Sequence, residues 1–162
     1  MYTKDHLLTA KIASKTSVKL ELTCIAYYGD KVIATDSYRM LEIPVEDGVA
    51  LDKPDLRIAS SAKMPHGFIT VDEPLGVKLP NAGEYPDINS VMKTMREGEF
   101  TTISVNGKLF GELLMQMAKV NESGKVTLRV PVAPEKAIIL EAPIGKVTSD
   151  IKATGLMMPL NK

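Results

Sequence analysis

The most regular stretch of the chain is Asn106–Val120, which reads NGKLFGELLMQMAKV. Asn106 is a favourable N-cap for a helix that begins at Gly107. Apolar side chains follow at helical spacing, namely Leu109, Phe110, Leu113, Leu114 and Met117. Lys108, Glu112 and Lys119 fall on the opposite side, and the two lysines, eleven residues apart, are nearly eclipsed. The stretch therefore predicts an amphipathic helix over 107–120 with a cationic outer face.

Strand patterns flank this helix. Residues 100–105 alternate weakly between apolar and polar side chains and predict a strand before it. Three further strands, separated by turns, are predicted after it, over 125–130, 136–141 and 151–157.

A second helix is predicted near the start of the chain, from about Thr3 to Ser14. Thr3 is a possible cap, and Asp5 lies in the first turn, where the helix dipole favours an acid. One side would be apolar through Leu7, Leu8 and Ile12. The other would carry lysines in a narrow arc: Lys4, Lys11 and Lys15.

Strands are also predicted after this first helix. Residues 18–25 alternate clearly, Gly29-Asp30 is a hairpin-type turn signal, and 31–35 reads as the return strand. A short strand is expected over 40–43, where it ends at Pro44. Five prolines punctuate the following stretch, in which 68–71 and 76–79 are possible short strands.

The order of elements is a helix followed by strands, repeated once. This grouping predicts an α+β fold, with two helices packed on antiparallel sheets, rather than a doubly wound parallel sheet. We expect a single domain over 1–162 with pseudo-duplicated half-units of about 1–99 and 100–162.

Composition limits the class of protein. The chain has 162 residues, 44% of them apolar and 25% charged, and its formal net charge is zero, so a histone-like or tail-type binder is excluded. The single cysteine, Cys24, excludes an intramolecular disulfide and a cysteine-cluster metal site. No apolar run is long enough for a membrane span, and the N-terminus is polar, so a cytoplasmic protein is expected.

Charge is nevertheless uneven along the chain. Residues 1–20 carry four lysines against one acid, and residues 101–130 carry four bases against two acids. The stretch 42–99 carries eleven acids against six bases. The positive segments coincide with the two predicted helices, which indicates either solvated helix faces or a basic binding surface.

No catalytic or metal-binding constellation is recognisable. His6 and His66 lack a second ligand at metal spacing, and Asp36 has no identifiable partner base or carboxylate. Ser60 and Lys63 have the spacing of some acyl-transfer enzymes, but the companion motifs are missing. We expect no enzyme, no metal and no cofactor.

Four segments together resemble the bacterial sliding clamps, the β subunits of the replicative DNA polymerase. Residues 34–40, ATDSYRM, resemble the clamp motif alanine-threonine-aspartate, two variable residues, arginine-leucine. Residues 83–88, GEYPDI, resemble the step that closes the second clamp domain, and 103–117 resemble the first strand and helix of the next. Residues 156–160, LMMPL, resemble the end of clamp chains.

The resemblance implies a DNA-clamp-like fold whose helices face duplex DNA, as in a polymerase processivity factor. Lysines on those helices would attract phosphates without reading the bases. The matching positions here are Lys4, Lys11, Lys15, Lys108 and Lys119.

The resemblance also implies a hydrophobic pocket for the clamp-binding peptides of replication proteins. The positions carried over to this chain are Thr35, Tyr38, Arg39, Met40, Met158, Pro159 and Leu160. Methionine side chains suit such adaptable binding.

Two departures from the clamp pattern matter. A clamp chain has three domains, and a dimer supplies the six domains that close a ring, so a ring of this chain would need about six copies joined head to tail. The usual arginine after the terminal Met-Pro step is Asn161 here. A homo-oligomer on DNA is expected. The alternative is a clamp-fold interaction module, a decoy or inhibitor of a host clamp, that does not bind DNA.

Overall fold

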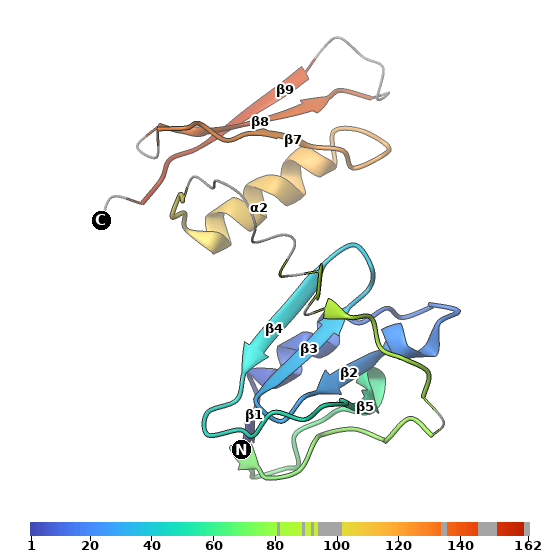
Figure 1. The fold of residues 1–162 in the computed structure, drawn as a ribbon. Helices are drawn as coiled ribbons and strands as arrows, with labels where there is room; N and C mark the ends of the chain where they lie inside the picture. The colour runs from blue at the N-terminus through green and yellow to red at the C-terminus, as the bar shows by residue number, and fades with distance from the viewer. Residues whose placement is uncertain are drawn as a thin grey trace. The chain divides into compact units, whose positions relative to one another are not determined.

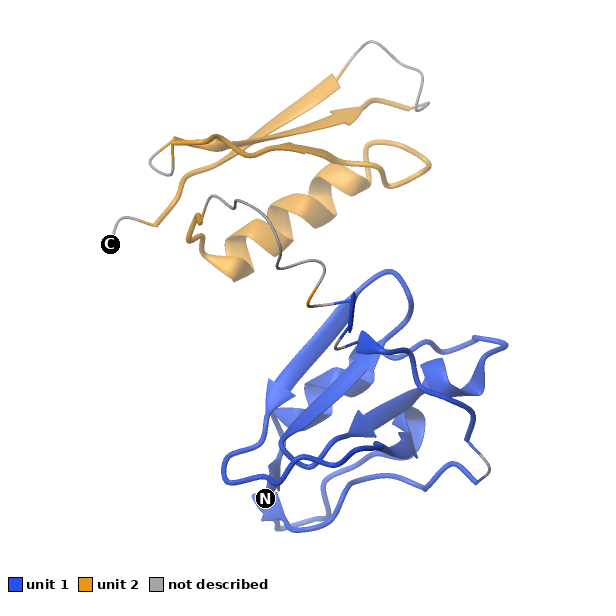
Figure 2. Cartoon of the chain, viewed as in Figure 1, with its two compact units in different colours: residues 1–92 blue, residues 93–162 orange. Residues whose placement is uncertain are grey.

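The chain folds into two compact units, residues 1–92 and 93–162, shown in the computed structural model (Figures 1 and 2). The structure describes residues 1–80, 82–88, 90–91, 93, 102–133, 136–145 and 152–160. Both units combine helical turns with antiparallel sheet, so the α+β class is as predicted. Whether the units act as one domain over 1–162 stays a prediction.

A four-stranded antiparallel sheet forms the centre of unit 1 (Figure 1). Its order is β4-β3-β2-β5, with β4 at Met40–Pro44, β3 at Lys31–Thr35, β2 at Cys24–Tyr27 and β5 at Asp55–Ile58. The predicted strands over 31–35 and 40–43 are confirmed. Strand β5 was not predicted, although its apolar residues alternate with Asp55 and Arg57.

Both faces of this sheet are covered. On one face Ile25, Tyr27 and Val32 pack with residues from the N-terminal segment, among them Tyr2 and Ala13. On the other face lies a second cluster that brings in the segment 85–88, formed by Cys24, Ala26, Ile33, Leu56, Tyr85 and Ile88. Strand β2 is therefore buried along its whole length.

The turn between β2 and β3 packs backbone against backbone. Gly29 has φ +83°, a conformation that favours glycine. A Cβ atom on Gly29 would collide with the carbonyl oxygen of Val49, and one on Gly48 would collide with that of Gly29. The predicted turn at Gly29-Asp30 is confirmed, and it is held by the chain around Gly48.

The predicted α-helix over 3–14 is wrong. The segment forms a 3-10 helix, η1, only over His6–Lys11, while Tyr2–Thr3 is strand β1 and pairs with β6, Thr70–Val71. Thr3 is not the N-cap, because η1 begins after Asp5; the hydroxyl oxygen of Thr3 accepts the Asp5 N–H at 3.2 Å and lies 3.0 Å from Nδ1 of His6. Lys4, Lys11 and Lys15 therefore do not form the predicted arc on one helix, because only Lys11 belongs to η1.

The predicted strand over 18–25 is also wrong in its first part. Residues Leu20–Thr23 form a 3-10 helix, η2, and the strand begins only at Cys24. Leu22 and Cys24 donate backbone N–H groups to carbonyl oxygens three residues earlier. Strand pairing with β5 starts at Cys24↔Ile58. Another short 3-10 helix, η3, follows β5 at Ala59–Ser61.

Two shorter strand predictions in the proline-rich stretch are only partly met. Of the stretch 68–71, only Thr70–Val71 is strand. Of the stretch 76–79, Lys78 forms a single bridge to Arg57.

Unit 2 places one helix on a three-stranded antiparallel sheet (Figure 1). The helix α2 spans Gly107–Ala118, and the sheet order is β7-β8-β9, with strands at Thr127–Arg129, Ile138–Pro143 and Lys152–Met157. These elements confirm the predicted helix and the three strands after it. The predicted strand over 100–105 lies partly outside the described residues, and 102–105 form no strand.

The core of unit 2 lies between α2 and the sheet. Met117 packs with the inward-facing side chains of β8, Ile138, Leu140 and Ala142. Phe110, Leu113 and Leu114 line the same cluster. Leu109 does not, because it is more than half exposed at the start of the helix.

In the part of the chain that the structure describes, no helix has the length and apolar character needed to cross a bilayer.

Candidate functional site

The outward face of α2 carries the two lysines predicted to bind DNA. The side chain of Asn106 accepts N–H groups of Lys108 and Leu109 at 3.1 Å and so starts the helix where the sequence predicts. Lys108 and Lys119 are both exposed. By helical geometry they lie within about 20° of each other and about 16 Å apart along the axis. Glu112 and Met115 share this face and are exposed as well.

The three N-terminal lysines are exposed around η1 in unit 1. Only Lys11 belongs to that 3-10 helix, as its last residue, while Lys4 precedes it and Lys15 follows it. They are therefore displayed by a turn, a short helix and a loop. The segment is anchored by His6, whose Nε2 lies 3.0 Å from the carbonyl oxygen of Pro44.

None of the five predicted lysines forms an ion pair with a described residue. The ion pairs of the described residues are made by other cations: Lys31, Arg39, Arg57, Lys78, Arg129 and Lys152. The five lysine ammonium groups are thus exposed without a carboxylate partner there, which suits an external anion.

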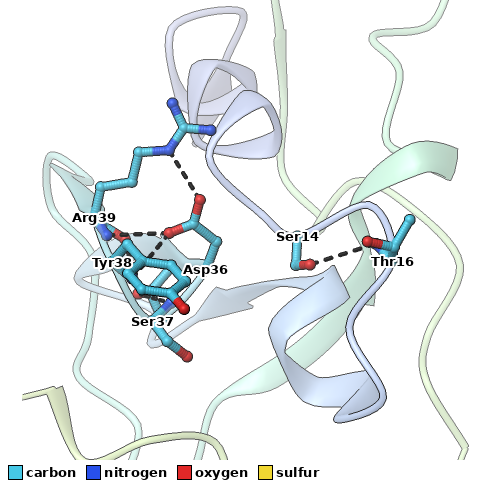
Figure 3. Close-up of polar contacts among 7 residues, drawn as sticks. Ser14, Thr16, Asp36, Ser37, Tyr38 and Arg39 are labelled. Atoms are coloured by element: carbon cyan, nitrogen blue, oxygen red, sulfur yellow. Dashed lines mark hydrogen bonds and ion pairs between the residues drawn. The ribbon is translucent and has the colours of Figure 1, made fainter. Parts of the chain in front are cut away.

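The β3–β4 loop holds the first group of predicted pocket residues and is built by side-chain hydrogen bonds (Figure 3). Oδ1 of Asp36 accepts the N–H groups of Tyr38 and Arg39 at 3.1 and 3.0 Å. Nε of Arg39 donates to Oδ2 of Asp36 at 2.9 Å. The Arg39 guanidinium and these N–H groups lower the pKa of Asp36. Asp36 therefore organises this loop.

The predicted residues of this loop differ in accessibility. Thr35 is buried, and its hydroxyl donates to the carbonyl oxygen of Arg39 at 2.8 Å. Met40 is half-buried against the sheet cluster that contains Cys24. Tyr38 is 97% exposed, so its ring is the most accessible apolar surface of the loop.

The second group of predicted pocket residues lies at the end of the described chain, in unit 2. Leu156, Met158 and Leu160 are 62, 65 and 53% exposed and alternate with half-buried Met157 and Pro159. We call Leu156, Met158 and Leu160 the C-terminal stripe. Leu156 was not predicted as a site residue, although its period-two spacing from Met158 is the signal that would have identified it.

The C-terminal stripe begins on the sheet face opposite α2. Leu156 pairs across β8 with Ile139, which is also exposed, whereas the neighbouring Gly155 lies under Leu113 of the helix. In unit 2 the lysine face of α2 and the start of the apolar stripe therefore point in opposite directions, so one could be occupied without blocking the other.

The two groups of predicted pocket residues belong to different units. Thr35, Tyr38, Arg39 and Met40 lie in unit 1, and Met158, Pro159 and Leu160 lie in unit 2. In unit 1 the exposed apolar side chain of this group is Tyr38, and in unit 2 the exposed apolar side chains are those of the C-terminal stripe.

Comparison with models of known protein families finds no match for the chain, and comparison with curated proteins finds none either. Among the described residues, no three or more His, Cys, Asp or Glu side chains cluster in a way that could hold a metal ion.

Proposed function

We propose that the chain is a sliding-clamp-like accessory protein of DNA replication. It binds duplex DNA without sequence preference through its exposed lysines and tethers partner proteins through the C-terminal stripe. Its two units correspond to pseudo-duplicated halves of a clamp-like domain, and copies of the chain associate around or along the duplex. No catalytic step is required, because attraction to phosphates and a docked partner are sufficient.

One observation carries this proposal, namely the arrangement of unit 2. Lys108 and Lys119 share the outward face of α2 without carboxylate partners among the described residues, and Leu156 lies on the far face of the sheet. A protein that holds DNA and a partner at once needs two such separate surfaces. The lysines contact a repeating backbone of phosphates, so sequence-independent binding is expected.

Charge reversal tests the DNA contact. Changing Lys11 and Lys119 to Glu should abolish binding to a fluorescent duplex, because two attractive contacts become repulsive. Changing Lys63 and Lys136, which are also exposed, to Glu gives a control with the same change in net charge. Loss in the first variant alone supports the proposal. Retention of DNA binding in the first variant contradicts it.

A second candidate is an interaction module that binds clamp-binding peptides or caps a host clamp without holding DNA. It is favoured by Glu112 and Met115, which lie among the lysines on the outer face of α2 and dilute its positive charge. The solution mass separates the two candidates, measured by light scattering at several concentrations. A mass near six chains favours a closed ring on DNA, whereas a monomer or dimer leaves no complete ring and favours the module.

A further inference from the structure

Unit 1 contains a hollow of about 670 Å³ beside β5, and its lining includes none of the residues discussed above as binding sites. Its apolar lining includes Tyr28, Leu56, Leu79 and Tyr85. We call this feature the edge hollow. Its volume lies within the range of ligand-binding sites, and its lining of aromatic and aliphatic side chains is typical of them.

The walls of the edge hollow are fixed by main-chain contacts. Leu79 donates its N–H to the carbonyl oxygen of Leu56 at 2.9 Å, which ties one wall to β5. Gly83, also in the lining, donates its N–H to Oε1 of Glu21 at 2.8 Å. Tyr85, a third lining residue, is buried in the unit 1 core. The hollow is therefore formed before any ligand arrives.

A short open edge of the sheet lies in the lining of the edge hollow, at Lys78. The carbonyl oxygen of Val77 and the N–H of Leu79 bond to β5, and Lys78 between them bridges Arg57. The N–H and carbonyl groups of Lys78 itself have no hydrogen-bond partner among the described residues. Because Val77 and Leu79 bond to β5, the backbone N–H and carbonyl groups of Lys78 point away from β5 and are free to pair with an added extended segment.

The rim of the edge hollow is negative. Asp52, Glu84 and Asp87 line it with exposed carboxylates. Two lysines, Lys53 and Lys78, also lie in the lining; the nearest carboxylate to Lys78, Asp55 at 3.7 Å, is held more closely by Arg57 at 2.7 Å. The lining therefore carries three acids against two lysines, a net negative charge that favours a cationic occupant.

Tyr28 lines the hollow together with Asp87. Burial, and secondly the charge of Asp87, raise the pKa of Tyr28. Its ring is already 5.8 Å from one ammonium group, Nζ of Lys31. A tyrosine ring beside carboxylates is a favourable surface for a planar guanidinium group.

We propose that the edge hollow binds an extended, arginine-containing segment of a partner protein. The segment adds to the sheet edge at Lys78, an apolar side chain fills the floor near Leu56, and an arginine pairs with Glu84 and Asp87 over Tyr28. Arginine is preferred over lysine because its planar, weakly hydrated head both stacks and forms paired hydrogen bonds. The site is independent of DNA binding and of the C-terminal stripe.

The test uses the full chain labelled with nitrogen-15 and a blocked peptide of alternating leucine and arginine. A peptide with citrulline in place of arginine is the matched neutral control. We expect shifts of the Lys78 and Gly83 amide signals and an affinity about tenfold lower for the citrulline peptide. Equal affinities for both peptides, or shifts that do not include these amides, overturn the proposal.

Paired variants locate the charge effect. Glu84→Gln with Asp87→Asn should weaken the arginine peptide about tenfold and the citrulline peptide little. Both replacements keep a side-chain oxygen, so the Ser90 N–H, now 3.0 Å from Oδ1 of Asp87, keeps an acceptor. The control pair is Asp72→Asn with Glu73→Gln, two exposed acids outside the hollow. Equal weakening by both pairs also overturns the proposal, because it shows only a general charge effect.

Discussion

Leu160 donates its backbone N–H to the carbonyl oxygen of Ser104 at 2.7 Å. This bond joins the end of the C-terminal stripe to the segment that leads into α2. The stripe is therefore held in place beyond the last residue of β9, although its side chains are exposed. An exposed apolar surface on a fixed backbone favours partner binding, because little conformational entropy is lost on docking.

Replacing Met158 and Leu160 by Ser should remove binding of a peptide that carries the clamp-binding motif. Both side chains are exposed, so the free energy of unfolding should change by about 0.5 kcal/mol or less per site. Fluorescence anisotropy measures the first effect, and urea denaturation measures the second. Val132→Ser, also at an exposed position in unit 2, is the control. Unchanged peptide affinity in the double variant would show that the C-terminal stripe does not bind the peptide.

Asn106→Ala should destabilise unit 2 by about 1 kcal/mol, because two N–H groups at the start of α2 lose their acceptor. Asn106→Asp keeps the acceptor and adds a favourable charge at the helix N-terminus, so it should be as stable as the wild type or more so. Thermal unfolding followed by circular dichroism compares them. Equal melting temperatures for the Ala and Asp variants would show that the cap contributes nothing.

Gly48→Ala should destabilise unit 1 by about 1–3 kcal/mol, because the new methyl group would meet the backbone at Gly29 and Asp30. Backbone atoms cannot turn aside as a side chain can. Gly107→Ala is the control, since nothing lies within 4 Å of its added Cβ. Alanine also favours a helix, so the control should be neutral or stabilising. Chemical denaturation measures the free energy of unfolding of the two variants. An unchanged free energy of unfolding for Gly48→Ala would contradict the close packing of this turn.

Alkaline pH should destabilise the fold through Tyr27. Burial raises the pKa of Tyr27 from 10.0 to about 12, although its hydroxyl donates to the carbonyl oxygen of Leu75 at 3.1 Å. The unfolded tyrosine ionises near pH 10, so the unfolded state binds fewer protons and stability falls between pH 10 and 12. The loss due to Tyr27 alone is on the order of 3 kcal/mol.

Urea denaturation at several alkaline pH values measures this loss. Tyr27→Phe is less stable at pH 8, because it loses the hydrogen bond to Leu75, but its stability should fall less steeply above pH 10. Parallel pH profiles for the variant and the wild type would show that another group causes the loss.

Local signals in the sequence predicted unit 2 better than unit 1. The helix at Gly107 has a cap, a stripe and a regular period that agree, and its three strands follow at short distance. In unit 1 the N-terminal segment has a helical pattern, but Tyr2 packs edge-to-face against Tyr27 and pairs with Val71 of β6. Such contacts between distant segments are not visible in a local pattern.

The strand prediction over 18–25 failed for a related reason. Its alternation was regular, yet Val18 and Leu20 face solvent and have no strand partner. One of the two strand partners of β2, strand β5, directly follows Pro54 and was not recognised. For the candidate site, the five predicted lysines are exposed, and their DNA contact stays a proposal.

The salt dependence of DNA binding tests the central claim most directly. The affinity for a duplex of random sequence should fall linearly with salt on a double-logarithmic plot, with a slope proportional to the phosphates contacted. Changing Lys108 and Lys119 to Gln should reduce the magnitude of this slope by about two, because each lysine releases about one counterion. A slope that is the same in the variant and the wild type would contradict the claim that these lysines face DNA.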